Sequence, residues 1–167
     1  GIDLDGGITI PPNQTSAQVY FRGERVRTAF ELRATSDAGL LGPTTPATGN
    51  TIRPNVPAKL AFVGPLTQTA RANECTPLPY VAELRDSYNN PTTYPGAMTV
   101  DVEAQPADGG VAVGAAPNCG AGSTATLAAN TSQVSFSARG IGARTYTLTA
   151  KVDGFSTAPA DLVVTPG

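Results

Sequence analysis

The sequence predicts an all-β sandwich protein, and three of its features support that prediction. The 167 residues include 18 Gly and 15 Pro, which interrupt helices and are frequent in tight turns. Many other residues are Thr and Val, which lose side-chain freedom in a helix and fit well in strands. Several short segments alternate apolar and polar residues, so each has one apolar face that a second sheet can cover.

This alternation predicts a series of strands in the second and larger part of the chain. The expected strands are residues 58–63, 79–86, 97–104, 111–115, 123–128, 132–138, 145–152 and 160–165. In the third of these segments, Met98, Val100 and Val102 share one face. Asp101 and Glu103 share the other face, and we interpret them as a solvated surface, because the acid pair of a glycosidase needs a sugar platform beside it.

Composition argues against catalysis, nucleic-acid binding and a membrane span. The chain has no His, which removes the commonest general base and the commonest metal ligand. Its net charge is −2 and it has no basic run, which disfavours a nucleic-acid surface. No segment approaches the roughly 18 consecutive apolar residues that a spanning helix needs. We therefore expect a non-catalytic protein with no cofactor, no nucleic-acid partner and no membrane span.

One stretch of sequence occurs twice in the chain. Gln18 and Gln133 occupy the same place in the two copies, and their separation fits one sandwich domain. The matched segments are 16–21 with 131–136, 8–10 with 125–127, Arg27-Thr28 with Arg144-Thr145, and Leu32 and Ala34 with Leu148 and Ala150. The last match requires a slip of a single residue between the copies.

The two copies differ in the length of sequence that precedes them. The second copy can extend back to residue 57, whereas the first has only 17 residues before Gln18. We therefore expect residues 1–53 to be the C-terminal half of one repeat, 54–57 to be a proline linker, and 57–167 to be a complete repeat. The half repeat is expected to have strands near residues 7–10, 17–22, 28–35 and 49–53.

A resemblance to a known family rests first on the sequence LRDSYNNP at residues 84–91. It is similar to the signature of bacterial Ig-like repeats, in which an Asp ends a strand and an Asn-Pro pair builds the next turn. With VPAKLAFVG at 56–64, the segment 123–152, Cys75 and Cys119, the chain resembles the disulfide-bearing Ig-like repeats of large bacterial surface proteins, especially myxobacterial ones, of the invasin and adhesin type. The resemblance implies an immunoglobulin-like β-sandwich, an extracellular or cell-surface location, and a structural or adhesive role.

Two other functions remain open. The chain could be a carbohydrate- or protein-binding accessory module of a secreted enzyme, which an exposed cluster of Tyr80, Tyr88 and Tyr94 would favour, although we expect Tyr80 in the core. It could also be a hydrolase, which turnover of glycans or peptides would reveal. A surface glycan or a protein is accordingly a further expected partner.

Cys75 and Cys119 are the only cysteines of the sequence. An even number of cysteines in a low-charge β protein expected to be exported indicates one disulfide, which would stabilise the fold by about 3–4 kcal/mol for a loop of this length. A metal site would have to complete its ligands with carboxylates, and a catalytic thiol would lack a base.

Two further groups of residues could form sites. Asp3 and Asp5, followed by Gly6, are weak candidates for calcium ligands, but an EF-hand loop needs more oxygen ligands and a closing Glu. We therefore expect a turn and no metal there. The basic stretch from Arg22 to Arg27 could bind an anion or a partner, but residues 139–144 keep two arginines, which favours a shared role in a turn.

We expect residues 1–53 to need a partner, because a half repeat cannot close a sandwich. Another polypeptide would complete it, either the upstream part of the same precursor or a strand from a neighbouring subunit. The alternative is that these residues fold back and widen a sheet of the 57–167 repeat. The chain opens at Gly1, which we interpret as the start of a processed product whose export signal has been removed.

Overall fold

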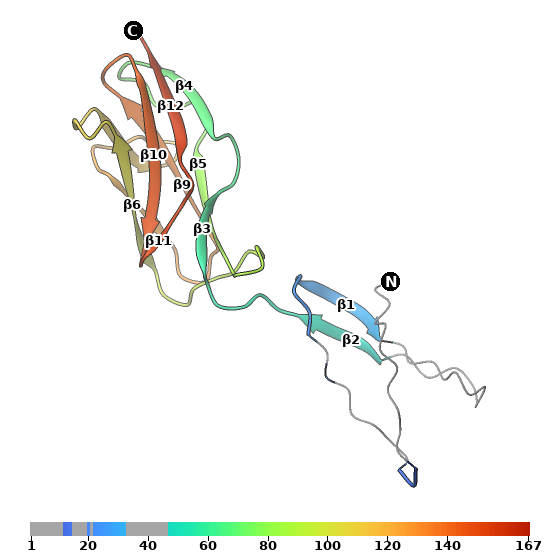
Figure 1. The fold of residues 1–167 in the computed structure, drawn as a ribbon. Helices are drawn as coiled ribbons and strands as arrows, with labels where there is room; N and C mark the ends of the chain where they lie inside the picture. The colour runs from blue at the N-terminus through green and yellow to red at the C-terminus, as the bar shows by residue number, and fades with distance from the viewer. Residues whose placement is uncertain (1–11, 15–19, 21, 33–46) are drawn as a thin grey trace.

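The structure is a computed structural model that describes residues 12–14, 20, 22–32 and 47–167 (Figure 1). In that part of the chain all regular structure is β, which confirms the predicted fold class. A 6-stranded and a 4-stranded sheet lie face to face as an immunoglobulin-like sandwich, and β1 (Arg27–Leu32) and β2 (Ala47–Ile52) form a separate 2-stranded sheet.

The larger sheet of the sandwich has the strand order β4-β12-β10-β6-β8, with the short β11 beside β10. These strands are β4 (Thr67–Arg71), β12 (Ala160–Thr165), β10 (Thr145–Val152), β6 (Met98–Gln105), β8 (Thr124–Leu127) and β11 (Phe155–Ser156). The smaller sheet has the order β3-β5-β9-β7. Its strands are β3 (Lys59–Phe62), β5 (Tyr80–Arg85), β9 (Gln133–Gly140) and β7 (Val111–Ala115).

The sequence patterns identified eight of these strands and missed β4 and β11. The buried residues of β4 are Gln68 and Ala70, which give almost no apolar alternation. β4 is held instead by parallel pairing with β12, a strand about ninety residues further along the chain. A polar edge strand defined by such a distant partner has no local signal in the sequence.

The core between the two sheets is centred on large side chains. Tyr80 of β5 and Phe136 of β9 are stacked with their ring centroids 5.6 Å apart, and Phe62 of β3 packs against both. The Tyr80 hydroxyl donates a hydrogen bond across the sandwich to the Asp161 carbonyl at 2.7 Å. Burial raises the pKa of Tyr80, and nearby Asp161 raises it further, so the phenol stays protonated. The expectation that Tyr80 is a core residue is therefore confirmed, since it is 1 % exposed.

β1 (Arg27–Leu32) and β2 (Ala47–Ile52) pair in antiparallel fashion. They overlap the strands expected at 28–35 and 49–53, whereas the expected strands 7–10 and 17–22 lie outside the described residues. Within the described part of the chain, neither β1 nor β2 pairs with a strand of the sandwich. The alternative in which this segment widens one of the sandwich sheets therefore has no counterpart among the described strands.

The structure joins Cys75 to Cys119 by a disulfide, with the two Cα atoms 5.5 Å apart. Cys75 lies in the β4–β5 connection, where the Thr76 amide donates to the Ala138 carbonyl of β9 at 2.8 Å. Cys119 lies in the β7–β8 connection, which folds back tightly over β7, since a Cβ on Gly114 would clash with this connection. The disulfide thus ties together two connections on opposite sides of β9.

We predict that the double substitution of Cys75→Ser and Cys119→Ser lowers the free energy of unfolding by about 3–4 kcal/mol, because the bond restricts the unfolded chain across 44 residues. Urea titration of the two proteins gives this difference, and non-reducing intact mass of exported material gives the state of the thiols. The unsubstituted protein in excess reductant is the matched control and should resemble the double variant. Two free thiols in exported material would contradict the prediction.

Candidate interface site at the Asp86 turn

The turn at residues 86–91, here called the Asp86 turn, is built around one carboxylate. Asp86 follows the last residue of β5, and its Oδ1 accepts hydrogen bonds from the amides of Tyr88 and Asn90, both at 2.9 Å. The Asp86 amide donates back to the Asn90 carbonyl at 2.9 Å. Asn89 has φ of 69°, a left-handed conformation that Asn tolerates better than most residues. This agrees with the sequence signature, in which an Asp ends the strand and an Asn-Pro pair forms the turn.

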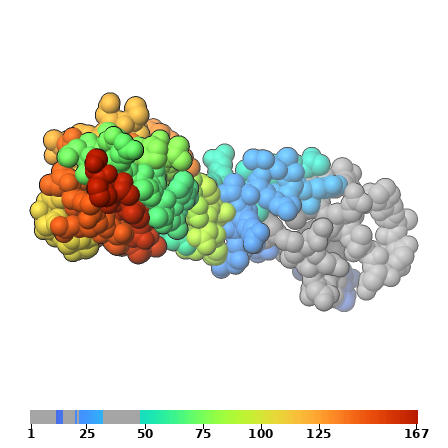
Figure 2. Space-filling model, turned by 90° about the horizontal axis from the view of Figure 1, so that it is seen from above, coloured from blue at the N-terminus to red at the C-terminus, as the bar shows by residue number. Residues whose placement is uncertain are grey.

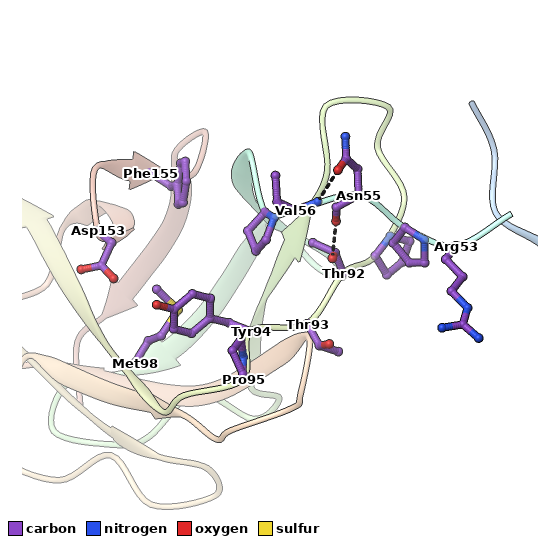
Figure 3. Close-up of a pocket in the computed structure, with 13 residues that line it drawn as sticks. Arg53, Asn55, Val56, Thr92, Thr93, Tyr94, Pro95, Met98, Asp153 and Phe155 are labelled. Carbon is purple, nitrogen blue, oxygen red and sulfur yellow. Dashed lines mark hydrogen bonds between the residues drawn. The ribbon is translucent and has the colours of Figure 1, made fainter. Parts of the chain in front are cut away.

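The other carboxylate oxygen of Asp86 holds the linker of residues 54–57. It accepts a hydrogen bond from the Asn55 amide at 3.0 Å, and the Asn55 carbonyl accepts one from the Thr92 hydroxyl at 2.7 Å (Figure 3). Both peptide groups of Asn55 are therefore fixed to the sandwich. Asp86 itself is 1 % exposed, so these bonds are made in a position that water hardly reaches.

The side chain of Asn90 connects the turn to the 22–26 loop that precedes β1. Its Nδ2 donates to Asp86 Oδ2 at 2.9 Å and to the Glu24 carbonyl at 2.8 Å. Its Oδ1 accepts a hydrogen bond from the Val26 amide at 3.1 Å. The Asn90 amide thus pairs with the peptide groups on either side of Arg25 as a neighbouring strand would. We call this set of contacts between the Asp86 turn, the linker and the 22–26 loop the joint.

Arg22 adds a side-chain contact to the joint. Its guanidinium lies 5.6 Å from the centroid of the Tyr88 ring and donates a hydrogen bond to the Tyr88 hydroxyl. Such a contact at an exposed site is worth about 0.5–1 kcal/mol, and the exposed Arg22–Glu24 ion pair at 3.6 Å contributes less. In Figure 2 the light-green atoms of the turn region meet the blue atoms that precede and form β1. The geometry of the joint is therefore defined chiefly by Asp86 and Asn90.

The hydrogen bonds at Asp86 set its charge state. Removal of the carboxylate from water acts to raise its pKa, but hydrogen bonds from the Asn90 side chain and from the amides of Asn55, Asn90 and Tyr88 outweigh this effect. The pKa of Asp86 is thereby lowered to about 2. The carboxylate is therefore charged at any physiological pH, which suits a group whose two oxygens only accept hydrogen bonds.

A groove of about 720 Å³ lies beside the joint (Figure 3). It is lined by residues 53–57, 91–95, Met98, Asp153 and Phe155. Tyr94, Asp153 and Phe155 stand on the sandwich side, and Arg53 lies at the far end of the linker. The tyrosines considered from the sequence do not form one platform, because Tyr80 is buried in the core and Tyr88 contacts Arg22.

The remaining candidate residues do not form a site in the described part of the chain. Asp3 and Asp5 lie outside it. Asp101 and Glu103 are exposed on the outer face of β6, and Glu103 pairs with Lys151 at 2.6 Å. Among the described residues there is no group of three or more Cys, Asp or Glu that could hold a metal ion. That part of the chain also has no helix long and apolar enough to cross a membrane.

Comparison with known proteins gives structural similarity without a family. No protein-family model matches the chain, and no curated protein matches it in sequence. Domains 4 and 5 of the S-layer protein SbsC are similar in structure, with a TM-score of 0.46 and 16 % identity over 72 % of this chain and 58 % of that one. A glycosyl hydrolase family 2 member from Bacteroides cellulosilyticus has a TM-score of 0.44 and 15 % identity over 83 % of this chain and 18 % of that one. The chain thus spans less than two thirds of each of these proteins, and similarity at this level carries no conclusion about function.

Sequence reasoning identified the Asp86 turn but not its partners. Asn90 was expected only to shape a turn, and the basic stretch from Arg22 was interpreted as a turn of its own repeat. The contact joins residues more than sixty positions apart. The loop contributes mainly backbone groups to this contact. Every residue except proline carries the same backbone donor and acceptor, so the sequence does not indicate such a contact.

We predict a pH-dependent stability that depends on Asp86. Because its folded pKa of about 2 lies below the usual 3.8, the stabilisation is complete above about pH 4 and is lost as the pH falls toward 2. Asp86→Asn should remove this part of the acid sensitivity and leave the protein less stable at neutral pH. Chemical denaturation between pH 2 and 7 measures both effects. Asp101→Asn, on the outer face of β6, is the control, and equal acid profiles for the two variants would contradict the role of Asp86.

Proposed function

We propose that the chain is a non-catalytic structural or adhesive module of an extracellular or cell-surface protein, in which Ig-like units follow one another through a joint of fixed geometry. The observation that carries the proposal is the pair Asp86 and Asn90. Together they hold the linker at Asn55 and the preceding loop at Glu24 and Val26. A freely hinged pair of domains needs no such contacts, whereas a stiff spacer does.

The strand registers support the repeat organisation that the proposal requires. β1 and β2 correspond to β10 and β12, and the matching residue pairs are Leu32–Ala47 with Leu148–Ala160, and Arg27–Ile52 with Arg144–Val164. β1 and β2 each have a single extra residue between these pairs. Ala29, with φ of 55°, and Gly49, with φ of 78°, lie at these positions as β-bulges. The bulge at Ala29 accounts for the one-residue slip between the Arg27–Arg144 match and the Leu32–Leu148 match.

Two glycines provide a second line of support. A Cβ on Gly23 would clash with the Ile52 side chain, and a Cβ on Gly140 would clash with Val164. Ile52 and Val164 are equivalent by strand register, so a glycine makes the same close approach at the same place in both segments. The sequence match of 22–27 with 139–144 already pairs these two glycines, and their shared contact with Ile52 and Val164 adds structural support for the repeat.

The location and the lack of catalysis in the proposal rest on chemistry. The Cys75–Cys119 disulfide is typical of proteins that mature in an oxidising compartment. The sequence has no His, and the described carboxylates of β6 lie on an open outer face. These features favour a structural module over a hydrolase.

A second candidate function is a carbohydrate- or protein-binding accessory module, and the groove beside the joint favours it. Tyr94 is 40 % exposed there, with Phe155 and Asp153 nearby, and an exposed aromatic ring with a polar neighbour can bind a sugar or a peptide. Titration with glycans that shifts the resonances of the groove residues, Phe155 among them, and that leaves Phe155 unshifted in Tyr94→Ala, would support this function.

We further propose that another polypeptide completes the first 53 residues. An isolated two-stranded hairpin is marginally stable in water. Residues 27–31 of β1 and 48–52 of β2 are exposed or half-buried, whereas Tyr146, Leu148 and Leu162 of β10 and β12 are fully buried. The upstream part of the same precursor is the favoured donor, and a strand of a neighbouring subunit is the alternative. Either would bury the faces that the described strands leave open.

We predict that Asn90→Ala loosens the joint while the sandwich stays folded. Loss of a neutral hydrogen bond of about 0.5–1.5 kcal/mol should speed hydrogen exchange of the Val26 amide about 2- to 10-fold. Small-angle scattering should show a broader distribution of dimensions. Ser87→Ala, in the same turn, is the matched control and should change neither quantity. Unchanged exchange at Val26 in Asn90→Ala would count against the fixed joint.

We predict that native material contains a second polypeptide or a second subunit. Size exclusion with light scattering, together with intact mass, should give a particle larger than the 17.0 kDa chain. Residues 57–167 serve as the internal control, since they should resist protease whether or not the partner is present. A monomer of 17.0 kDa whose first 53 residues are equally protected would rule out complementation.

A further inference from the structure

The end of the sandwich remote from β1 and β2 is formed by the β9–β10 turn and the residues after β12 (Figure 1). We propose that this end, residues 141–144 with 165–167, is a docking surface for a turn of another repeat of this kind. The turn has an Asp and an Asn at the positions of Asp86 and Asn90, and we call it an Asp86-type turn. The inference rests on the repeat organisation of the proposed function, and it adds a second interface and the chemistry of its partner.

The two backbone groups that bind Asn90 have counterparts at this end. Arg27 lies opposite Ile52, and the Arg144 carbonyl accepts a hydrogen bond from the Val164 amide. The two pairs occupy the same place in the registers of β1–β2 and β10–β12, so Arg27 and Arg144 are equivalent. The Glu24 carbonyl, three residues before Arg27, therefore corresponds to the Ile141 carbonyl. The Val26 amide, one residue before Arg27, corresponds to the Ala143 amide.

The linker contact has a counterpart as well. Ile52 corresponds to Val164, so Pro54 corresponds to Pro166, and Asn55 corresponds to Gly167. The Asn55 amide binds the Asp86 carboxylate, and the Gly167 amide is its equivalent. All three backbone groups that hold Asp86 and Asn90 are thus repeated at the far end of the sandwich.

The equivalent groups are available for binding. Ile141 is 57 % exposed and Ala143 is exposed. Among the described residues, the Ile141 carbonyl and the Ala143 amide have no hydrogen-bond partner. The loop itself is well supported, since the Ile141 amide donates to the Gly110 carbonyl at 2.9 Å and Arg144 pairs with Asp108 at 2.7 Å. A supported loop with open backbone groups loses little freedom on binding.

Because the Asn amide binds backbone groups, residues 24–26 and residues 141–143 can present the same binding geometry although their side chains differ. Glu24, Arg25 and Val26 correspond to Ile141, Gly142 and Ala143, and no side chain of these residues is needed to bind an Asn amide. The Arg22–Tyr88 contact is not repeated, because the corresponding Arg139 approaches the Gly120 carbonyl within the sandwich. The second interface should therefore depend more strongly on the Asp and Asn of the incoming turn.

The two ends of the sandwich are different surfaces. The Asp86 turn lies at one end and the β9–β10 turn at the other, so the contact is head to tail (Figure 1). Head-to-tail contacts extend in one direction and form an open series of units unless the rotation between units closes a ring. The partner is therefore another repeat with an Asp86-type turn, and not a two-fold-related copy of the same surface.

A tandem chain tests the inference. A second copy of residues 56–167 is joined after Gly167, which keeps the spacing of the natural linker because Gly167 takes the place of Asn55. Hydrogen exchange of the Ala143 amide in the first copy is measured by NMR in the single and the tandem chains. We expect exchange to slow about 2- to 10-fold in the tandem chain, as one neutral hydrogen bond would give.

Variants of the second copy separate docking from general crowding. Asn90→Ala there should return Ala143 exchange to the single-chain rate, whereas Ser87→Ala there should not. The Val26 amide of the same sample reports the original joint. Protection at Val26 without protection at Ala143 would overturn this inference and leave the proposed joint standing, and loss of protection at both amides would overturn both.

Discussion

The carboxylate of Asp86 is the group on which the joint depends, because its two oxygens face different parts of the molecule. Oδ1 closes the turn through the amides of Tyr88 and Asn90, and Oδ2 holds Asn55 and the Asn90 side chain. Asp86 also accepts a hydrogen bond from the Asn90 side chain, which helps to orient that side chain toward Glu24 and Val26. A single buried anion thus connects the shape of a turn, the path of the linker and the position of the preceding loop. Its low pKa follows from the same hydrogen bonds.

The fold of the sandwich was largely predictable from the sequence, because its strands bury one face each. Met98, Val100 and Val102 alternate with exposed residues along β6, and that pattern is local. β4 was not predictable, since Gln68 and Ala70 become buried only through pairing with the distant β12. Strand order and the two-sheet topology likewise depend on partners far apart in the sequence.

In the candidate site, too, the local features were predictable from the sequence and the contacts with distant residues were not. Asp86 was recognisable because an Asp after a strand and an Asn before Pro91 are turn residues in any context. The role of Asn90 between two units was not recognisable, because its partners are the backbone groups of residues 24 and 26. The repeated sequence, by contrast, gave a usable guide, since the glycines at 23 and 140 occupy equivalent positions against Ile52 and Val164.

The position of β12 within its sheet has a mechanical consequence. The chain enters the sandwich through β3 at the joint and leaves through β12 at the opposite end, and the two strands belong to different sheets. Tension along the long axis would therefore pull β12 lengthwise between β4 and β10, so that its hydrogen bonds are loaded together in shear and are not peeled apart one at a time. β3 pairs with β5 alone, over four residues, so fewer inter-strand hydrogen bonds resist the load at this end than at β12.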